Sequence, residues 1–191
     1  MATWVTDWGD LPPEGASVPE LARRRAEFTR AVVEAATSRP EEDAPWLSAV
    51  RCIGASGCAG RVEVLDDFDH GEVRWRCATC GDEGVVRGWE HCNHDLSDFV
   101  PCDDLRRWVL DDEEREYLHG ATRGLPDLRA VIMRASPHAR DPRVLVVEAS
   151  VEELDELYTL IEELTDVARG RREHELLDGL RASLCTSMDG F

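Results

Sequence analysis

Two pairs of cysteines constrain the fold of this chain more than any other feature of its sequence. Cys52 and Cys58 have five residues between them, Cys77 and Cys80 have two, and 18 residues separate the pairs. Thiolates carried on two turns can surround one cation tetrahedrally, which is the arrangement of structural zinc sites. The sequence therefore predicts a zinc ribbon with these four cysteines as its ligands.

The stretch between the two pairs has the pattern of a β-hairpin. Residues 61–66 (RVEVLD) and 72–76 (EVRWR) alternate like strands, and DFDHG between them has the composition of a turn. A third short strand, GVVRGW, begins at Gly84. Gly60 and Gly81 come just past the second cysteine of each pair, where a metal-binding turn needs a residue that tolerates positive φ.

The sequence weighs against disulfide and redox roles for these cysteines. The chain has seven cysteines, an odd number, and its N-terminal residues lack the pattern of an export signal. A redox pair needs a helix beginning at its first cysteine, and GDEGVVRGW after Cys80 does not begin a helix. Cys52 is the weakest of the predicted ligands because its spacing is wide, and His70 in the hairpin turn is the candidate substitute.

Further residues that can bind metals fall in one loop: His91, Cys92, His94 and Cys102. They are candidates for a second metal site or for a catalytic loop. HCNH lacks the paired spacing with which one turn shares a metal, so a polar loop beside the ribbon is the favoured interpretation.

The charge of the chain limits what it can bind. It has 40 acidic and 22 basic residues, a net charge of −18, and every basic residue is arginine. The absence of lysine excludes a Walker phosphate-binding motif and Schiff-base chemistry. An acidic field repels phosphates, so direct binding to nucleic acid is disfavoured. No Ser-His-Asp order and no His-Glu-x-x-His helix is present, so an enzyme that uses His91, Cys92 or His94 is the least favoured class of function.

Arginines and a tryptophan of the ribbon form a candidate contact surface for nucleic acid or a partner. Arg74 and Arg76 share a strand face, Arg87 lies on the neighbouring strand, and Trp89 follows it. Acidic residues close by dilute this charge, so a solvated face above core tryptophans is the favoured alternative.

The N-terminal segment is expected to be an arm followed by a helix. Residues 1–16 contain Pro12, Pro13 and Gly15 and have the composition of an arm. The next residues, SVPE, have the spacing of a capping box between Ser17 and Glu20, and apolar residues then recur at helical intervals. This pattern predicts a helix over 18–37.

The C-terminal segment is expected to combine two short strands with helices. Two stretches have the composition of strands, RRWVL and RVLVVEA. Each is followed by the spacing of a capping box, formed by Asp111 with Glu114 and by Ser150 with Glu153. LPDLRAVIMRAS fits a helical period. The last two helices are separated by Gly170 and read as a helical hairpin.

Two stretches resemble a known family. CATCGDEGVVRGW and the final MDGF are similar to motifs of a family of small bacterial proteins that have a zinc-ribbon-like segment and a C-terminal helical part. The resemblance covers about residues 49–191. It implies a ribbon that uses Cys77 and Cys80, with Cys52 and Cys58 as the matching upstream pair, and it implies no activity.

Taken together, these patterns predict an α+β protein in three parts. An N-terminal arm and helix (1–48) precede a zinc ribbon of three antiparallel strands (49–91), and a C-terminal α+β unit (103–191) follows. The predicted function of the whole protein is that of a non-enzymatic, zinc-binding module that interacts with another protein. The alternative is a nucleic-acid-associated ribbon, or an acidic mimic of nucleic acid that acts on a basic partner.

The sequence also predicts where the protein is found. MATWVTDWGD at the N-terminus carries acidic residues in place of the basic start of an export signal, and the longest apolar runs are far shorter than a membrane span. We therefore expect a cytoplasmic protein without a membrane partner.

Overall fold

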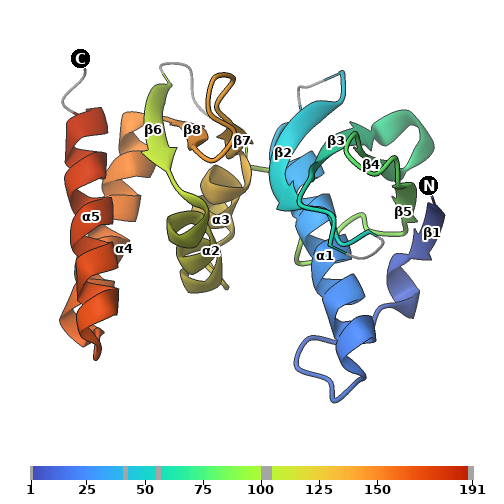
Figure 1. The fold of residues 1–191 in the computed structure, drawn as a ribbon, viewed down its shortest axis with the longest axis horizontal. Helices are drawn as coiled ribbons and strands as arrows, with labels where there is room; N and C mark the ends of the chain where they lie inside the picture. Colours follow the sequence, from blue (N-terminus) through green and yellow to red (C-terminus); the bar gives the residue numbers. More distant parts are fainter. Residues whose placement is uncertain (1, 41–42, 55–56, 100–104, 189–191) are drawn as a thin grey trace. The chain divides into compact units, whose positions relative to one another are not determined.

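The computed structural model describes residues 2–40, 43–54, 57–99 and 105–188. Contacts between Cα atoms divide the chain into two compact units, Met1–Val100 and Pro101–Phe191. Each unit combines helices with a sheet of its own, so the predicted α+β class is confirmed (Figure 1). Within the described residues, no helix is both long and apolar enough to cross a membrane.

A five-stranded sheet forms the centre of unit 1, in the order β1-β5-β4-β3-β2. The predicted ribbon strands correspond to β3 (Arg61–Asp67), β4 (Glu72–Cys77) and β5 (Glu83–Arg87), which pair antiparallel. At one side β2 (Trp46–Arg51) adds antiparallel to β3, and at the other β1 (Thr3–Asp7) adds parallel to β5. The ribbon is thus the middle of a larger sheet.

Residues 1–16, expected as an arm, contain β1 and a short 3-10 helix, η1 (Trp8–Asp10). β1 pairs in parallel with β5, and a hydrogen bond from the N–H of Glu83 to the carbonyl of Ala2 (3.0 Å) lies at the start of this ladder. A strand this short is stable only when paired, and its partner lies far along the chain, so no local pattern indicates it.

One helix, α1 (Glu20–Thr37), covers one face of this sheet. Its Phe28 packs edge-to-face on Trp75 of β4, with ring centroids 4.9 Å apart, and Trp4 of β1 packs on Trp75 from another side at 5.9 Å. The predicted capping box of Ser17 and Glu20 is wrong. Helix α1 begins directly after Pro19, whose ring offers no oxygen to accept a cap hydrogen bond.

Unit 2 contains a three-stranded antiparallel sheet, in the order β6-β8-β7. The predicted strands are β6 (Arg106–Leu110) and β8 (Leu145–Ala149), and a two-residue strand β7 (Ser136–Pro137) adds to β8. The helix α3 (Pro126–Met133), predicted from its period, is confirmed. Arg134, just after α3, is buried and donates to Glu153 (2.8 Å), which ties α3 to the start of the next helix.

Both capping boxes predicted for unit 2 are present, and they begin α2 (Asp112–Ala121) and α4 (Val151–Val167). Helix α4 packs against α5 (Arg171–Met188) as the expected hairpin (Figure 1). Buried residues at helical spacing form the contact, namely Leu154, Leu157, Ile161, Leu177, Leu180 and Leu184.

Candidate metal centre

The four predicted cysteine ligands converge at one end of the sheet in unit 1. All four Sγ atoms lie within 4.8 Å of one another. The two shortest separations join different turns: Cys52 to Cys80 at 3.6 Å, and Cys58 to Cys77 at 3.7 Å. Among the described residues, no other set of three or more histidine, cysteine or acidic side chains is gathered this closely.

These separations fit a tetrahedral metal site. A zinc–sulfur bond of about 2.3 Å gives sulfur–sulfur edges of about 3.8 Å around one ion. A disulfide requires about 2.05 Å, far shorter than the observed distances. Burial raises the pKa of the Cys52 thiol, so thiolates gathered here need a cation to balance their charge. The donor set and its spacing therefore suit a soft divalent ion.

In each cysteine loop, a backbone hydrogen bond joins the first residue to the last. The N–H of Cys52 donates to the carbonyl of Gly60 (2.8 Å), and the N–H of Cys77 donates to the carbonyl of Asp82 (2.8 Å). The first closure compensates for the wide spacing of the upstream pair, so Cys52 joins the cluster. His70 lies instead at the other end of β3, where its Nδ1 contacts Asp67 Oδ1 (2.7 Å).

Each sulfur accepts a backbone N–H from the residue two positions later. Gly54 donates to Cys52 (3.2 Å) and Gly60 to Cys58 (3.4 Å). Thr79 and Asp82 donate to Cys77 and Cys80 in the same way. Such bonds stabilise the charged form of a thiol.

The acidity of Cys77 shows the effect of these bonds. Burial opposes ionisation of this thiol, but the N–H groups of Cys80 and Thr79, together with the thiols of Cys52 and Cys58, outweigh it and lower its pKa to about 7. One ligand of the cluster is thus prepared to bind a cation near neutral pH.

Glycines let the backbone approach the sulfurs. Gly81 has a φ of 75°, as predicted for the second turn. Gly60 does not have positive φ, and its role is one of space: a Cβ there would lie 2.8 Å from the Cys77 sulfur and 2.7 Å from Cβ of Thr79. At Gly54 a Cβ would lie 3.1 Å from the sulfurs of both Cys52 and Cys80.

The loop that carries His91, Cys92 and His94 sends only His94 of these three into the core of unit 1, since His91 is exposed and Cys92 is partly exposed. Cys102 lies outside the described residues. His94 is buried, and its Nδ1 contacts the carboxylate of Glu34, which is fully buried on α1. The N–H of Leu96 donates to Thr37 (3.0 Å) and holds the loop on the same helix. The polar-loop interpretation missed this role, because the sequence carries no signal that joins His94 to Glu34.

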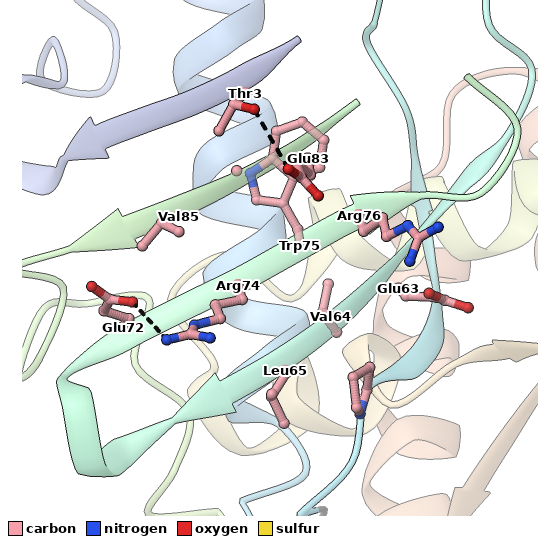
Figure 2. Close-up of a pocket in the computed structure, with 12 residues that line it drawn as sticks. Thr3, Glu63, Val64, Leu65, Glu72, Arg74, Trp75, Arg76, Glu83 and Val85 are labelled. Atoms are coloured by element: carbon pink, nitrogen blue, oxygen red, sulfur yellow. Dashed lines mark hydrogen bonds and ion pairs between the residues drawn. The ribbon is translucent and has the colours of Figure 1, made fainter. Parts of the chain in front are cut away.

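Of the candidate contact residues of the ribbon, the arginines lie beside acidic residues and the tryptophan lies in the core. Arg74 contacts Asp67 (3.0 Å) and Glu72 (3.2 Å), and Arg87 contacts the same Glu72 (2.6 Å). Figure 2 shows Arg74 and Arg76 on the face of the sheet, with Arg74 joined to Glu72.

Acidic partners therefore offset the charge of Arg74 and Arg87, as the sequence indicated. Arg76 is exposed and stands between Glu63 and Glu83 in the cross-strand register. Trp89 is fully buried and packs against Phe68, with ring centroids 6.1 Å apart. Trp89 is therefore a core residue and not a contact residue.

Compared with known proteins, the chain matches no protein-family model, no curated protein and no solved structure. The family resemblance of the motifs stays a prediction.

Proposed function

We propose that Cys52, Cys58, Cys77 and Cys80 bind one zinc ion with a structural role, and that the protein is a non-enzymatic interaction module of the cytoplasm. The observation that carries the zinc assignment is the pair of sulfur–sulfur distances, 3.6 and 3.7 Å, both close to the edge of a zinc–thiolate tetrahedron. Four thiolates suit zinc better than the oxygen-seeking cations magnesium and calcium.

A structural role follows from the number of ligands. Four protein thiolates complete the coordination shell of zinc and leave no position for a water molecule or substrate. The ion would instead join the loop after β2 to the turn after β4, each of which is closed on itself by backbone hydrogen bonds. Binding of roughly 10–16 kcal/mol would then contribute directly to folding.

Metal analysis tests this proposal. Purified protein is expected to contain close to one zinc ion per chain, and replacement by cobalt should give the intense thiolate charge-transfer absorption of a tetrahedral all-sulfur site. Cys58→Ser should abolish that spectrum. Cys185→Ser is the matched control, because Cys185 lies on α5 of unit 2 and should leave the spectrum unchanged. Folded protein that binds neither metal would refute the assignment.

A second candidate function is mimicry of nucleic acid toward a basic partner, and the outer face of α4 favours it. Six acidic residues of this helix are exposed, and among the described residues none of them is in an ion pair: Glu152, Asp155, Glu156, Glu162, Glu163 and Asp166. A helix face of one sign attracts a basic surface. The test is competition: the intact protein should displace DNA from a basic partner without binding DNA itself.

A further inference from the structure

A groove runs along the outer edge of β1 in unit 1. It has a volume of about 740 Å³, and β1 forms one wall along its whole length while the first half of α1 forms the other. Trp4 and Thr6 line it from the strand, and Leu21, Arg25 and Ala26 line it from the helix. We name this hollow the β1–α1 groove.

The strand wall offers unpaired backbone groups. In a strand, the backbone N–H and C=O groups of successive residues point to opposite sides. The carbonyl of Ala2 accepts from the N–H of Glu83, so Ala2 and Trp4 direct their backbone groups toward β5. Thr3 and Val5 therefore direct their N–H and C=O groups away from the sheet. β1 is the last strand on this side, so no strand of the described chain pairs with them.

This edge lacks the protection that natural sheets give to exposed edges. Prolines, inward-pointing charges or a covering segment normally prevent another chain from pairing with an edge strand. β1 reads TWVTD and carries one charge, at its last residue. Val5 is 69% exposed at the middle of the strand. An extended chain can therefore add to β1.

The helix wall offers apolar contacts for the side chains of such a chain. Leu21 on the first turn of α1 is 61% exposed, so its side chain is accessible to a segment added beside β1. Ala22 and Ala26 are small and keep the groove open next to it. Alternate side chains of an extended segment point toward this wall, because strands have a period of two.

Charge distinguishes the two ends of the groove. Arg25 lies over the ring of Trp4, 4.9 Å from its centroid, and Arg24 lines an adjoining hollow that reaches Gly54 in the metal-binding loop. Asp7 and Asp10 line the opposite end. Asp82 also lines that hollow but is buried, and its carboxylate accepts the N–H of Ala2 (2.7 Å). Arg24 and Arg25 are exposed, so these two side chains can pair with carboxylates of a bound segment at this end.

We propose that the β1–α1 groove binds an extended segment of a partner protein by adding it to β1. The segment has apolar residues at alternate positions and acidic side chains at the end that meets Arg24 and Arg25. This is strand addition beside a helix, in which main-chain bonds give affinity and side-chain contacts give specificity. The inference rests on the proposed interaction role and names the class of partner.

The experiment begins with phage display of short random peptides on the zinc-loaded chain. We expect selected sequences with alternate apolar residues and acidic residues at one end. The selected peptide, made synthetically with a fluorescent label, should bind Val5→Pro at least about tenfold more weakly, because proline removes an outward N–H. Val5→Thr keeps that N–H and is the matched control. Arg25→Gln should also weaken binding, whereas Arg23→Gln, outside the groove, should not.

Hydrogen exchange on the unmodified chain tests the same proposal without any variant. Exchange of the Val5 amide should slow when the peptide is added, and exchange of the β6 amides should stay unchanged. Selection of no peptide, equal binding to Val5→Pro and Val5→Thr in folded protein, or pairing of β1 with a second copy of the chain would each overturn it. Zinc content, measured on the same samples, separates failure of the groove from failure of the metal assignment.

Discussion

The Sγ atoms of Cys52 and Cys80 lie 3.6 Å apart, although Cys52 follows β2 and Cys80 stands between β4 and β5. Their proximity depends on both loops folding at once. A cation held between them would make the central sheet of unit 1 conditional on metal.

Removal of zinc should therefore unfold unit 1 and spare unit 2. Structural zinc contributes roughly 10–16 kcal/mol to the folding of small domains, which matches or exceeds the net free energy of unfolding that such domains usually have. Hydrogen exchange with mass spectrometry, before and after chelation, should show loss of protection in β3 and β4 and unchanged protection in α4 and α5. Retained protection in β3 and β4 after complete loss of metal would contradict this prediction.

Gly60→Ala should weaken the metal centre. The new Cβ would lie 2.8 Å from the Cys77 sulfur, so the upstream loop must move away from its ligand position. We expect a loss of about 1–3 kcal/mol in unfolding free energy of the zinc-loaded protein and weaker zinc retention against a chelator. Gly170→Ala is the control, since no atom lies within 4 Å of a Cβ there. Equal unfolding free energy and equal zinc retention in the two variants would mean that the loop accommodates a Cβ at position 60 without moving.

His94→Ala should destabilise unit 1 without changing its zinc content. Removing the imidazole leaves the carboxylate of Glu34 buried without this partner, a defect that costs about 3 kcal/mol. Glu14→Gln is the control, because Glu14 is half-exposed and lies 3.7 Å from His94 Nε2, so it should change stability by less than about 1 kcal/mol. Chemical denaturation and metal analysis measure the two effects. A fall in bound metal would instead indicate that His94 belongs to a metal site.

Asp66 should make unit 1 less stable as pH rises. Both of its carboxyl oxygens are buried without a hydrogen-bond partner, and burial, with Asp95, Asp67 and Glu90 nearby, raises its pKa from 3.8 to about 7. The unfolded chain releases this proton above pH 3.8, and the folded chain keeps it up to about pH 7. Stability therefore falls through this window, and the whole penalty is present above it.

Asp66→Asn should remove that pH dependence and stabilise the protein near pH 8. The side chain is only partly buried, so solvent reduces the effect to on the order of 1 kcal/mol. Asp69→Asn, at an exposed position, is the comparison. Denaturation of the zinc-loaded proteins at pH 6 and pH 8 measures it. A variant that is no more stable than the parent at the higher pH would show that the folded protein ionises Asp66 without penalty.

Features that depend on residues close together along the chain could be predicted before the structure was known. The strand alternation of 61–66 and 72–76, the capping boxes at Asp111 and Ser150, and the spacing within each cysteine pair could be predicted, because turns, caps and strand periods are local. Even the failed capping box at Ser17 was a local error, since Pro19 occupies the cap position.

Contacts between residues far apart along the chain could not be predicted in this way. The parallel pairing of β1 with β5, the contact of His94 with Glu34 and the burial of Trp89 join segments that no periodic pattern connects. The physical reason is that a buried charge or an unpaired strand is stabilised by whichever group the folded chain brings to it, and that choice is made by packing over the whole unit.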